Sequence, residues 1–273
     1  MTRPPSHARA SVWATFKKSP LVDIFKFLLL VGGITWFMVR GTTDLGYNWQ
    51  WYRVSRYIFS FENGILTPGP LLSGLAVTLR ITAISLLLAF VFGLTTALLR
   101  LSSSFLARVV ARGYLELIRN TPLLVQLFFI YFVLGPVLDI DRFASAVLAL
   151  SLFEGAYASE IFRAGIVSIH RGQWEAAYSL GLGSVHTYRY VILPQAVRQI
   201  LPPLTSQAIS LIKDSALVST IAIYDLTMRG QAIISETFLT FEIWFTVAAI
   251  YLLVTVLLSF LVNFMENRFR VES

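Results

Sequence analysis

Residues 71–99 restrict the possible folds more than any other stretch of the chain. The stretch holds 29 residues and a single charge, Arg80. An α-helix needs roughly 20 mainly apolar residues to cross a bilayer, and within lipid its backbone polar groups must bond to one another. The stretch therefore predicts a transmembrane helix, and we expect the chain to be an all-α integral membrane protein.

Further apolar runs bring the expected number of transmembrane helices to about six. The runs cover residues 24–39, 71–99, 121–134, 143–166, 204–223 and 243–265. The hydrophobic share of 56% is above that of ordinary soluble domains. The first run is short, but no small-residue cleavage site follows it, so we expect a retained helix rather than a signal peptide.

The connecting segments differ in character. Residues 41–70 combine aromatic rings with arginines, which predicts a helix lying at the membrane interface. Pro68-Gly69-Pro70 predicts a sharp break before the next helix. The remaining connections are expected to be a basic loop with some helix at 100–120, a short turn at 135–142, and a loop with a short helix at 224–242.

The distribution of basic residues predicts the orientation. If both termini are cytoplasmic, 15 of the 22 Lys and Arg residues lie in cytoplasmic segments, 5 lie outside, and Arg80 and Lys213 lie within helices. Such a bias is typical of membrane proteins. It also explains the net charge of +7 without a nucleic-acid partner.

A polar segment at residues 173–203 interrupts this membrane-like pattern. Residues 173–180 can form a short helix, which Gly181 and Gly183 can end by adopting a left-handed backbone. A second short helix is expected from Ser184, as N-cap, to about residue 192, where Pro194 would end it. The result is a compact helix-turn-helix on the cytoplasmic side, whose small side chains suit docking into a groove of another protein.

This segment resembles the EAA loop of ATP-binding-cassette (ABC) importer permeases. The matching residues are Glu175, Ala176, Ala177, Gly181, Leu193 and Pro194, with Val191 where the family usually has Ile. Residues 113–124, 155–157, 160–161, 165–166, 193–196 and 209–215 resemble the polar amino-acid permeases of that family, in the same order. The resemblance covers the chain from about residue 74 onward.

The resemblance implies a five-helix type I permease domain over residues 71–273. Residues 1–70 would then add an N-terminal cytoplasmic tail, an extra transmembrane helix and a periplasmic interfacial loop. The implied protein is the permease subunit of an importer for a polar or charged L-amino acid, such as glutamate or glutamine, in a bacterial inner membrane. Glu175, Ala176, Ala177, Gly181, Leu193 and Pro194 would couple it to the ATPase.

The resemblance also implies partners. They are a homodimer of ABC ATPase subunits, a second permease subunit or a second copy of this chain, and a periplasmic amino-acid-binding protein. The sequence has no phosphate-binding Gly-Lys-Ser/Thr loop, so ATP and Mg²⁺ would belong to the ATPase, and we expect no enzyme activity or bound cofactor. The chain has no Cys, and its three His residues are scattered, so no metal site is expected.

Charged and polar residues inside the predicted helices suggest a substrate path. The candidates are Arg80, Glu154, Tyr157, Lys213 and Asp214. Arg80 could bind the carboxylate of an amino acid or form a structural ion pair with Glu154 or Asp214, and Glu154 could bind an ammonium group or pair with Arg80. A local pair of Glu160 with Arg163, three residues apart, is expected to be structural.

Two other interpretations stay open from the residues alone. Arg80, Glu154 and Asp214 could form the relay of a secondary transporter driven by an ion gradient, although no inverted repeat is visible. An intramembrane enzyme is a remote alternative. Glu175 taken alone could be a solvated glutamate at a helix start, stabilised by the helix dipole.

Overall fold

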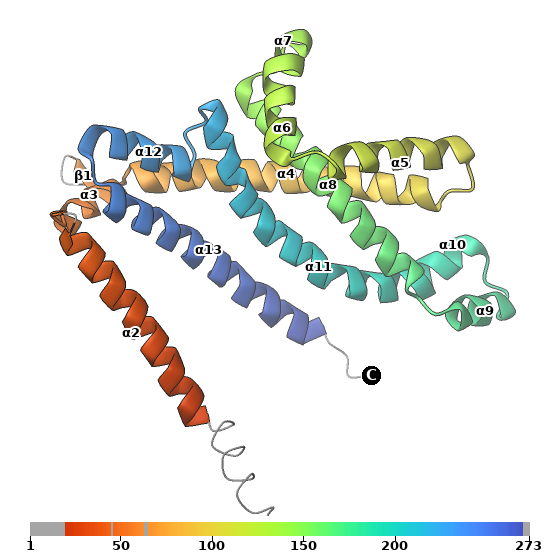
Figure 1. Ribbon diagram of the computed structural model, residues 1–273. Helices are drawn as coiled ribbons and strands as arrows, with labels where there is room; N and C mark the ends of the chain where they lie inside the picture. The colour runs from red at the N-terminus through yellow and green to blue at the C-terminus, as the bar shows by residue number, and fades with distance from the viewer. Residues whose placement is uncertain (1–19, 45, 63–64, 270–273) are drawn as a thin grey trace, which may run out of the picture. The chain divides into compact units, whose positions relative to one another are not determined.

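The structure is a computed structural model that describes residues 20–44, 46–62 and 65–269. It divides into two compact units, residues 1–50 and 51–273, and each is described by itself. The division at residue 70 inferred from the sequence stays a prediction. Helices make up most of the described chain (Figure 1), as expected for an all-α protein.

The first unit consists mainly of helix α2, Pro20–Asp44. Within it, the 20 residues Val22–Gly41 are apolar enough and long enough to cross a membrane. The sequence prediction placed this helix at residues 24–39, which was too short because the helix continues through its polar flanks.

The second unit begins with short elements that correct one expectation. A 3₁₀ turn, Trp51–Arg53, and α3, Ser55–Ile58, lead into an antiparallel hairpin of β1, Phe59–Glu62, and β2, Ile65–Pro68. The interfacial helix predicted for residues 41–70 is therefore wrong over the hairpin. Alternation explains the strands, because Phe59 and Phe61 point to one face while the Ser60 hydroxyl lies 2.8 Å from that of Thr67 on the paired strand.

Two long helices form the centre of the second unit. Helix α4, Pro70–Leu101, packs along α8, Arg142–Val167 (Figure 1). Small residues allow the close approach, since a Cβ atom added at Gly93 would lie 2.8 Å from the Cβ of Ala158. The predicted break before α4 is confirmed, because Gly69 precedes the helix and Pro70 is its first residue.

In the chain, a bent pair of helical segments connects α4 to α8. Helix α5, Phe105–Arg119, is followed by α6, Leu123–Phe128, a π-helical segment, Phe129–Leu134, and α7, Gly135–Leu138. The two parts of this pair meet at 105°. The turn predicted for residues 135–142 is therefore wrong over its first part, since the helix ends only at Asp139, which has a φ of 53°.

The C-terminal half supplies the remaining helices. They are α9, Arg171–Ser179, α10, Ser184–His186, α11, Leu193–Asp214, α12, Leu226–Thr237, and α13, Thr240–Phe269. Among the described residues, four helices are long and apolar enough to cross a membrane, and five if the bent pair counts as one. The fifth predicted helix, residues 204–223, lies on α11 and a 3₁₀ turn, Ser215–Ile221, which are not among them.

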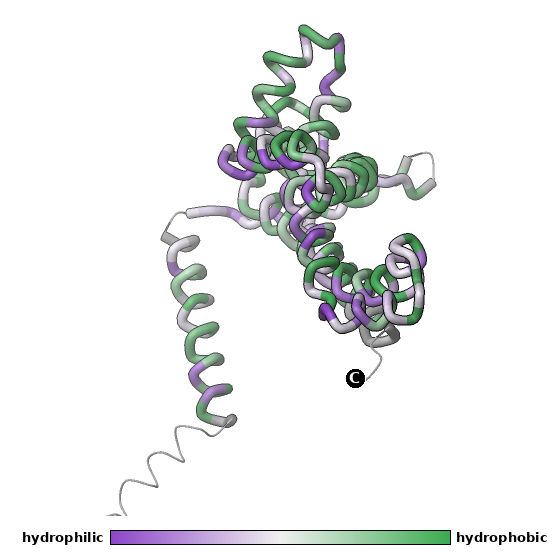
Figure 2. Tube along the Cα trace, turned by 90° about the vertical axis from the view of Figure 1, so that its right-hand side faces the viewer, coloured by the Kyte–Doolittle hydropathy of each residue, from purple (hydrophilic) through white to green (hydrophobic). Residues whose placement is uncertain are grey.

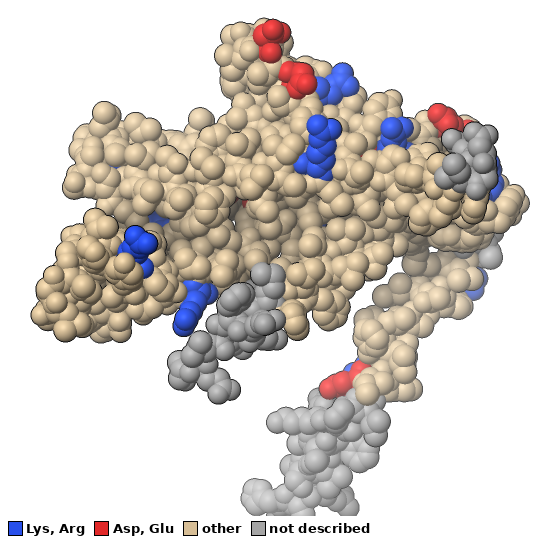
Figure 3. All heavy atoms as spheres, turned by 180° about the vertical axis from the view of Figure 1, so that it is seen from behind, with Lys and Arg blue, Asp and Glu red and all other residues tan. Residues whose placement is uncertain are grey.

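Surface composition agrees with a membrane protein. Apolar residues predominate along the helices in Figure 2. On the face seen in Figure 3, charged side chains are few and are separated by broad areas of uncharged residues. Long apolar side chains such as Leu87 and Phe260 are 70% and 69% exposed, which suits contact with lipid.

Candidate functional site

Helix α9 carries the central residues of the polar segment 173–203, which we call the docking segment. It begins after His170, whose Nδ1 accepts the N–H of Gly172 at 3.1 Å. It ends at Gly181, whose φ of 78° is the left-handed conformation predicted for this position. The N–H of Leu182 donates to the carbonyl of Ala177 at 3.1 Å, a bond typical of a glycine-capped helix end.

The docking segment exposes most of the residues that match the EAA loop. Glu175 and Ala176 are exposed, whereas Ala177 is only 2% exposed and anchors α9. The ring of Trp174 meets that of Tyr188 edge-on, with centroids 5.0 Å apart. Leu193 and Pro194 are also exposed. The arrangement gives a firm surface on which a partner can approach the backbone closely.

The second helix of this segment departs from expectation in two ways. Gly183 has an ordinary φ of −69° and is itself the N-cap, so it does not end α9 and Ser184 is the first helical residue. Pro194 does not end the helix. A π-helical turn, Thr187–Ile192, leads directly into α11, so helical backbone runs through Pro194, the second residue of α11.

A cluster of polar side chains lies between α8 and α11. Glu154 is 2% exposed, and its Oε2 accepts a hydrogen bond of 2.6 Å from Nε2 of Gln207. The carboxylate of Asp214 is a second acidic group near that of Glu154. Within the described part of the chain, Oε1 of Glu154 has no hydrogen-bond partner. The structure thus brings Glu154, Gln207 and Asp214 together, and their place on a substrate path stays a prediction.

Gln207 was missed by the sequence analysis. It lies seven residues before Asp214 on the same helix, and residues seven apart share a helix face. That spacing could have identified it. Lys213, next to Asp214, is exposed on this single chain.

Arg80 does not join this cluster. It is exposed on α4, and its guanidinium lies 5.1 Å from the ring centre of Phe143. Phe143 lies 11 residues before Glu154 on α8, or roughly 16 Å along the helix. The ion pair of Arg80 with Glu154 or Asp214, one of the two open interpretations of Arg80, is therefore not formed among the described residues.

Glu160 is the centre of an ionic network near the end of α8. The predicted pair with Arg163 is confirmed, with 3.3 Å between Nε and Oε2. Arg100 of α4 and Arg119 of α5 also reach Glu160, at 2.6 Å and 3.1 Å. Helix spacing identifies only the local pair, because the other two arginines come from distant parts of the chain.

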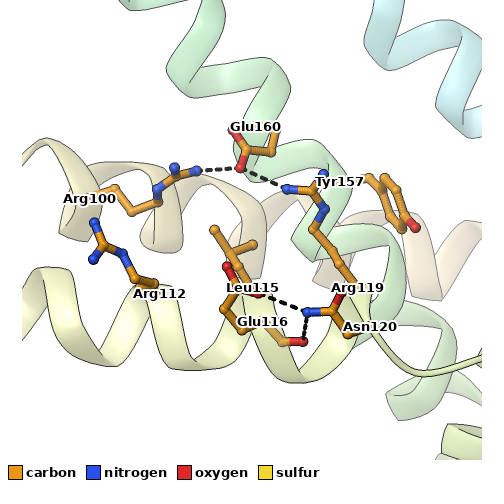
Figure 4. Close-up of a pocket in the computed structure, with 8 residues that line it drawn as sticks. All are labelled: Arg100, Arg112, Leu115, Glu116, Arg119, Asn120, Tyr157 and Glu160. Carbon is orange, nitrogen blue, oxygen red and sulfur yellow. Dashed lines mark hydrogen bonds and ion pairs between the residues drawn. The ribbon is translucent and has the colours of Figure 1, made fainter.

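This network borders a pocket of about 310 Å³ (Figure 4). Its lining combines three arginines with two carboxylates, two neutral polar residues and one leucine. These residues are Arg100, Arg112, Arg119, Glu116, Glu160, Asn120, Tyr157 and Leu115. Tyr157 is the one residue of the predicted substrate path in this lining. The guanidinium of Arg119 lies 5.8 Å from the centre of its ring.

Curated proteins of similar sequence are amino-acid permeases. The glutamine transport system permease protein GlnP of Escherichia coli (strain K12) is 42% identical over 204 residues, covering 74% of this chain and 93% of that protein. The L-cystine transport system permease protein TcyB of Bacillus subtilis (strain 168) is 43% identical, covering 73% and 86%. The nopaline transport system permease protein NocM of Agrobacterium fabrum is 39% identical, covering 72% and 86%.

Solved structures show the same fold. A crystal structure of an amino acid ABC transporter with histidines matches with a TM-score of 0.69 and 41% identity, covering 73% of this chain and 94% of that one. An inward-facing structure of the MetNI methionine ABC transporter matches in fold, with a TM-score of 0.62 and 19% identity over 74% and 96% of the two chains. The family described as binding-protein-dependent transport system inner membrane component matches residues 89–271. The chain belongs to this family and is a multi-pass permease of the polar amino-acid ABC type.

Proposed function

We propose that the chain is the membrane-crossing permease subunit of an ATP-driven importer for a polar or charged L-amino acid. The relatives named for glutamine, L-cystine and nopaline support an amino-acid-like substrate. The observation that carries the proposal is the exposed, glycine-capped docking surface formed by α9 and the helix after it.

The docking surface is suited to an ATPase. The exposed carboxylate of Glu175 can accept charge-assisted hydrogen bonds from an arginine of the partner. Ala176, beside it, leaves room for the partner's backbone, and Gly181 fixes the turn. The same helical stretch continues as α11, so a push at this surface moves the helix that carries Gln207 and Asp214.

The cluster of Glu154, Gln207 and Asp214 is suited to a cationic group. A buried carboxylate without a cation is costly, by several kcal/mol for an unpaired ion. The ammonium group of an amino acid would supply the missing positive charge and a donor for Oε1 of Glu154. We assign Glu154 and Asp214 this role, with Lys213 beside them and Tyr157 further along α8.

Arg80 has a separate place in the proposed path. Its neighbour Phe143 lies roughly 16 Å from Glu154 along α8. That distance is too great for Arg80 and Glu154 to hold the carboxylate and the ammonium group of the same α-amino acid, because one carbon joins them. Arg80 would meet the substrate at another stage of its passage.

The proposed assembly has four kinds of component. Two ATPase subunits would bind the cytoplasmic docking surface and hold ATP and Mg²⁺. A second permease subunit, identical or related, would complete the pathway, and a periplasmic binding protein would deliver the substrate. Both termini would be cytoplasmic, as the distribution of Lys and Arg predicts.

The test combines purification with transport. Purification of the tagged chain from native membranes, with mass spectrometry, should recover an ABC ATPase. In vesicles holding that complex, Glu175→Ala should leave the complex in the membrane but lower amino-acid uptake per ATP hydrolysed. Glu236→Ala, on the exposed face of α12, is the matched control. Uptake that persists without ATP and follows an ion gradient would instead support a secondary transporter.

A further inference from the structure

The pocket between α4, α5 and α8 carries an excess of positive charge. Three arginines line it against the carboxylates of Glu116 and Glu160. Glu160 is already paired with Arg100, Arg119 and Arg163, and Oε2 of Glu116 accepts a hydrogen bond of 2.8 Å from Asn120. The pocket lining therefore carries more positive than negative charge, which favours binding of an anion.

Arg112 is the arginine of this pocket whose charge is least compensated. It is exposed, and no carboxylate pairs with it among the ion pairs of the described residues. Figure 4 shows it on the same side of the pocket as Arg100. Two guanidinium groups lining the same pocket repel each other unless an anion lies between them.

The pocket lies near the C-terminal end of α4, where Arg100 lines it. Helix α4 has 32 residues, which gives a length of about 48 Å, whereas the hydrocarbon core of a bilayer is about 30 Å thick. A helix of this length extends beyond the hydrocarbon at one end or both unless it is strongly tilted. Arg100 is the second residue from the C-terminal end of α4, and α8 ends at Val167, seven residues after Glu160 and four residues before α9 begins at Arg171. In the orientation given in the proposed function, this places the pocket at the level of the cytoplasmic lipid headgroups.

Helix α5 is amphipathic in a way that suits this level. Arg108, Arg112 and Arg119 are spaced four and seven residues apart, which places them along one face. Apolar side chains on the neighbouring face are exposed: Phe105, Leu106, Val109, Val110 and Leu117. A helix with an arginine stripe beside an exposed apolar face is typical of a membrane interface.

We propose that this pocket binds the phosphate of an anionic phospholipid in the cytoplasmic leaflet. Arg112 and Arg119 hold the phosphate oxygens, since the planar guanidinium fork matches phosphate geometry. The acyl chains lie on the exposed apolar face of α5. The assignment of the leaflet rests on the orientation given in the proposed function.

The test measures lipid retention by the purified complex. Native mass spectrometry after mild delipidation should show phosphatidylglycerol, but not phosphatidylcholine, bound to the wild type. Arg112→Gln should lower phosphatidylglycerol affinity about 10-fold, the loss of one charge-assisted contact of roughly 1.5 kcal/mol. Arg112→Lys should restore it in part. Arg198→Gln, an exposed arginine on α11 outside the pocket, is the matched control.

Competition separates the possible sources of the anion. Inorganic phosphate and the transported amino acid should not displace phosphatidylglycerol, because neither has acyl chains. Displacement by either would overturn the proposal in favour of a soluble anion, and so would equal lipid retention by Arg112→Gln and Arg198→Gln. The readout needs no transport, so failure of the importer proposal would show in the ATPase and uptake assays instead.

Discussion

The packing of α4 against α8 predicts the effect of one added methyl group at Gly93. A Cβ atom there would lie 2.8 Å from the Cβ of Ala158 and 3.1 Å from the carbonyl oxygen of Gly155. Carbon atoms in favourable contact are roughly 3.5–4.0 Å apart, so Gly93→Ala must separate the helices by roughly 1 Å. Overpacking of this kind costs about 1–3 kcal/mol. At about 2–4 °C per kcal/mol, we expect Tm to fall by roughly 2–12 °C.

The assay is thermal unfolding of the purified chain in detergent, followed by tryptophan fluorescence. Gly113→Ala is the matched control, because a Cβ atom at Gly113 on α5 meets nothing within 4 Å. Alanine is favoured over glycine within a helix by roughly 0.5–1 kcal/mol, so this variant should unfold at the wild-type temperature or above it. If Gly93→Ala matched Gly113→Ala, the close approach of α4 and α8 would not contribute to stability as argued.

Two further predictions concern buried carboxylates. Glu154→Gln keeps an acceptor for Gln207 but removes the charge, and the ATPase should still co-purify. We expect uptake to fall about 10- to 100-fold, as for loss of a charge-assisted contact of roughly 1.5–3 kcal/mol. Unchanged uptake would leave Glu154 structural. Burial raises the pKa of Asp225, before α12, to about 6. Its protonated form therefore stabilises the folded state, and this contribution is full below the ordinary aspartate pKa of about 4 and is lost as pH rises through about 6. Tm measured from pH 7 to pH 5 should rise more for the wild type than for Asp225→Asn, which keeps the oxygen that caps Met228.

The transmembrane helices with continuous apolar runs were predictable from the sequence. Residues 143–166 correspond to α8, Arg142–Val167, almost end to end, because Asp141 caps the helix and apolar residues fill it. The role of Gly181 was predictable from its residue type, because few residues other than glycine adopt its φ of 78° without strain. In both cases the signal is local to the residues concerned.

Gln207 could have been identified from local helix spacing, but other features were missed because they depend on residues far apart in the chain. Glu160 showed only its helix neighbour Arg163 in the sequence, whereas its partners Arg100 and Arg119 lie 60 and 41 residues away. Arg80 was expected near Glu154, but the pairing of α4 with α8 places it beside Phe143 instead. Helix spacing gives the face on which a charge lies, and only the packing of two helices decides what it meets.

Pro194 shows how a local rule can hide a functional connection. Proline usually ends a helix because it lacks an N–H and its ring clashes with the preceding turn. Here the π-helical turn Thr187–Ile192 leads directly into α11, and helical backbone runs through Pro194. The stretch from Leu193 to Asp214 then forms one helix of roughly 32 Å. A break at Pro194 would absorb a displacement of the docking surface as a change in the angle between two helices. In the proposed importer, the continuous helix would instead carry the displacement toward Gln207 and Asp214, and thus toward the carboxylate of Glu154.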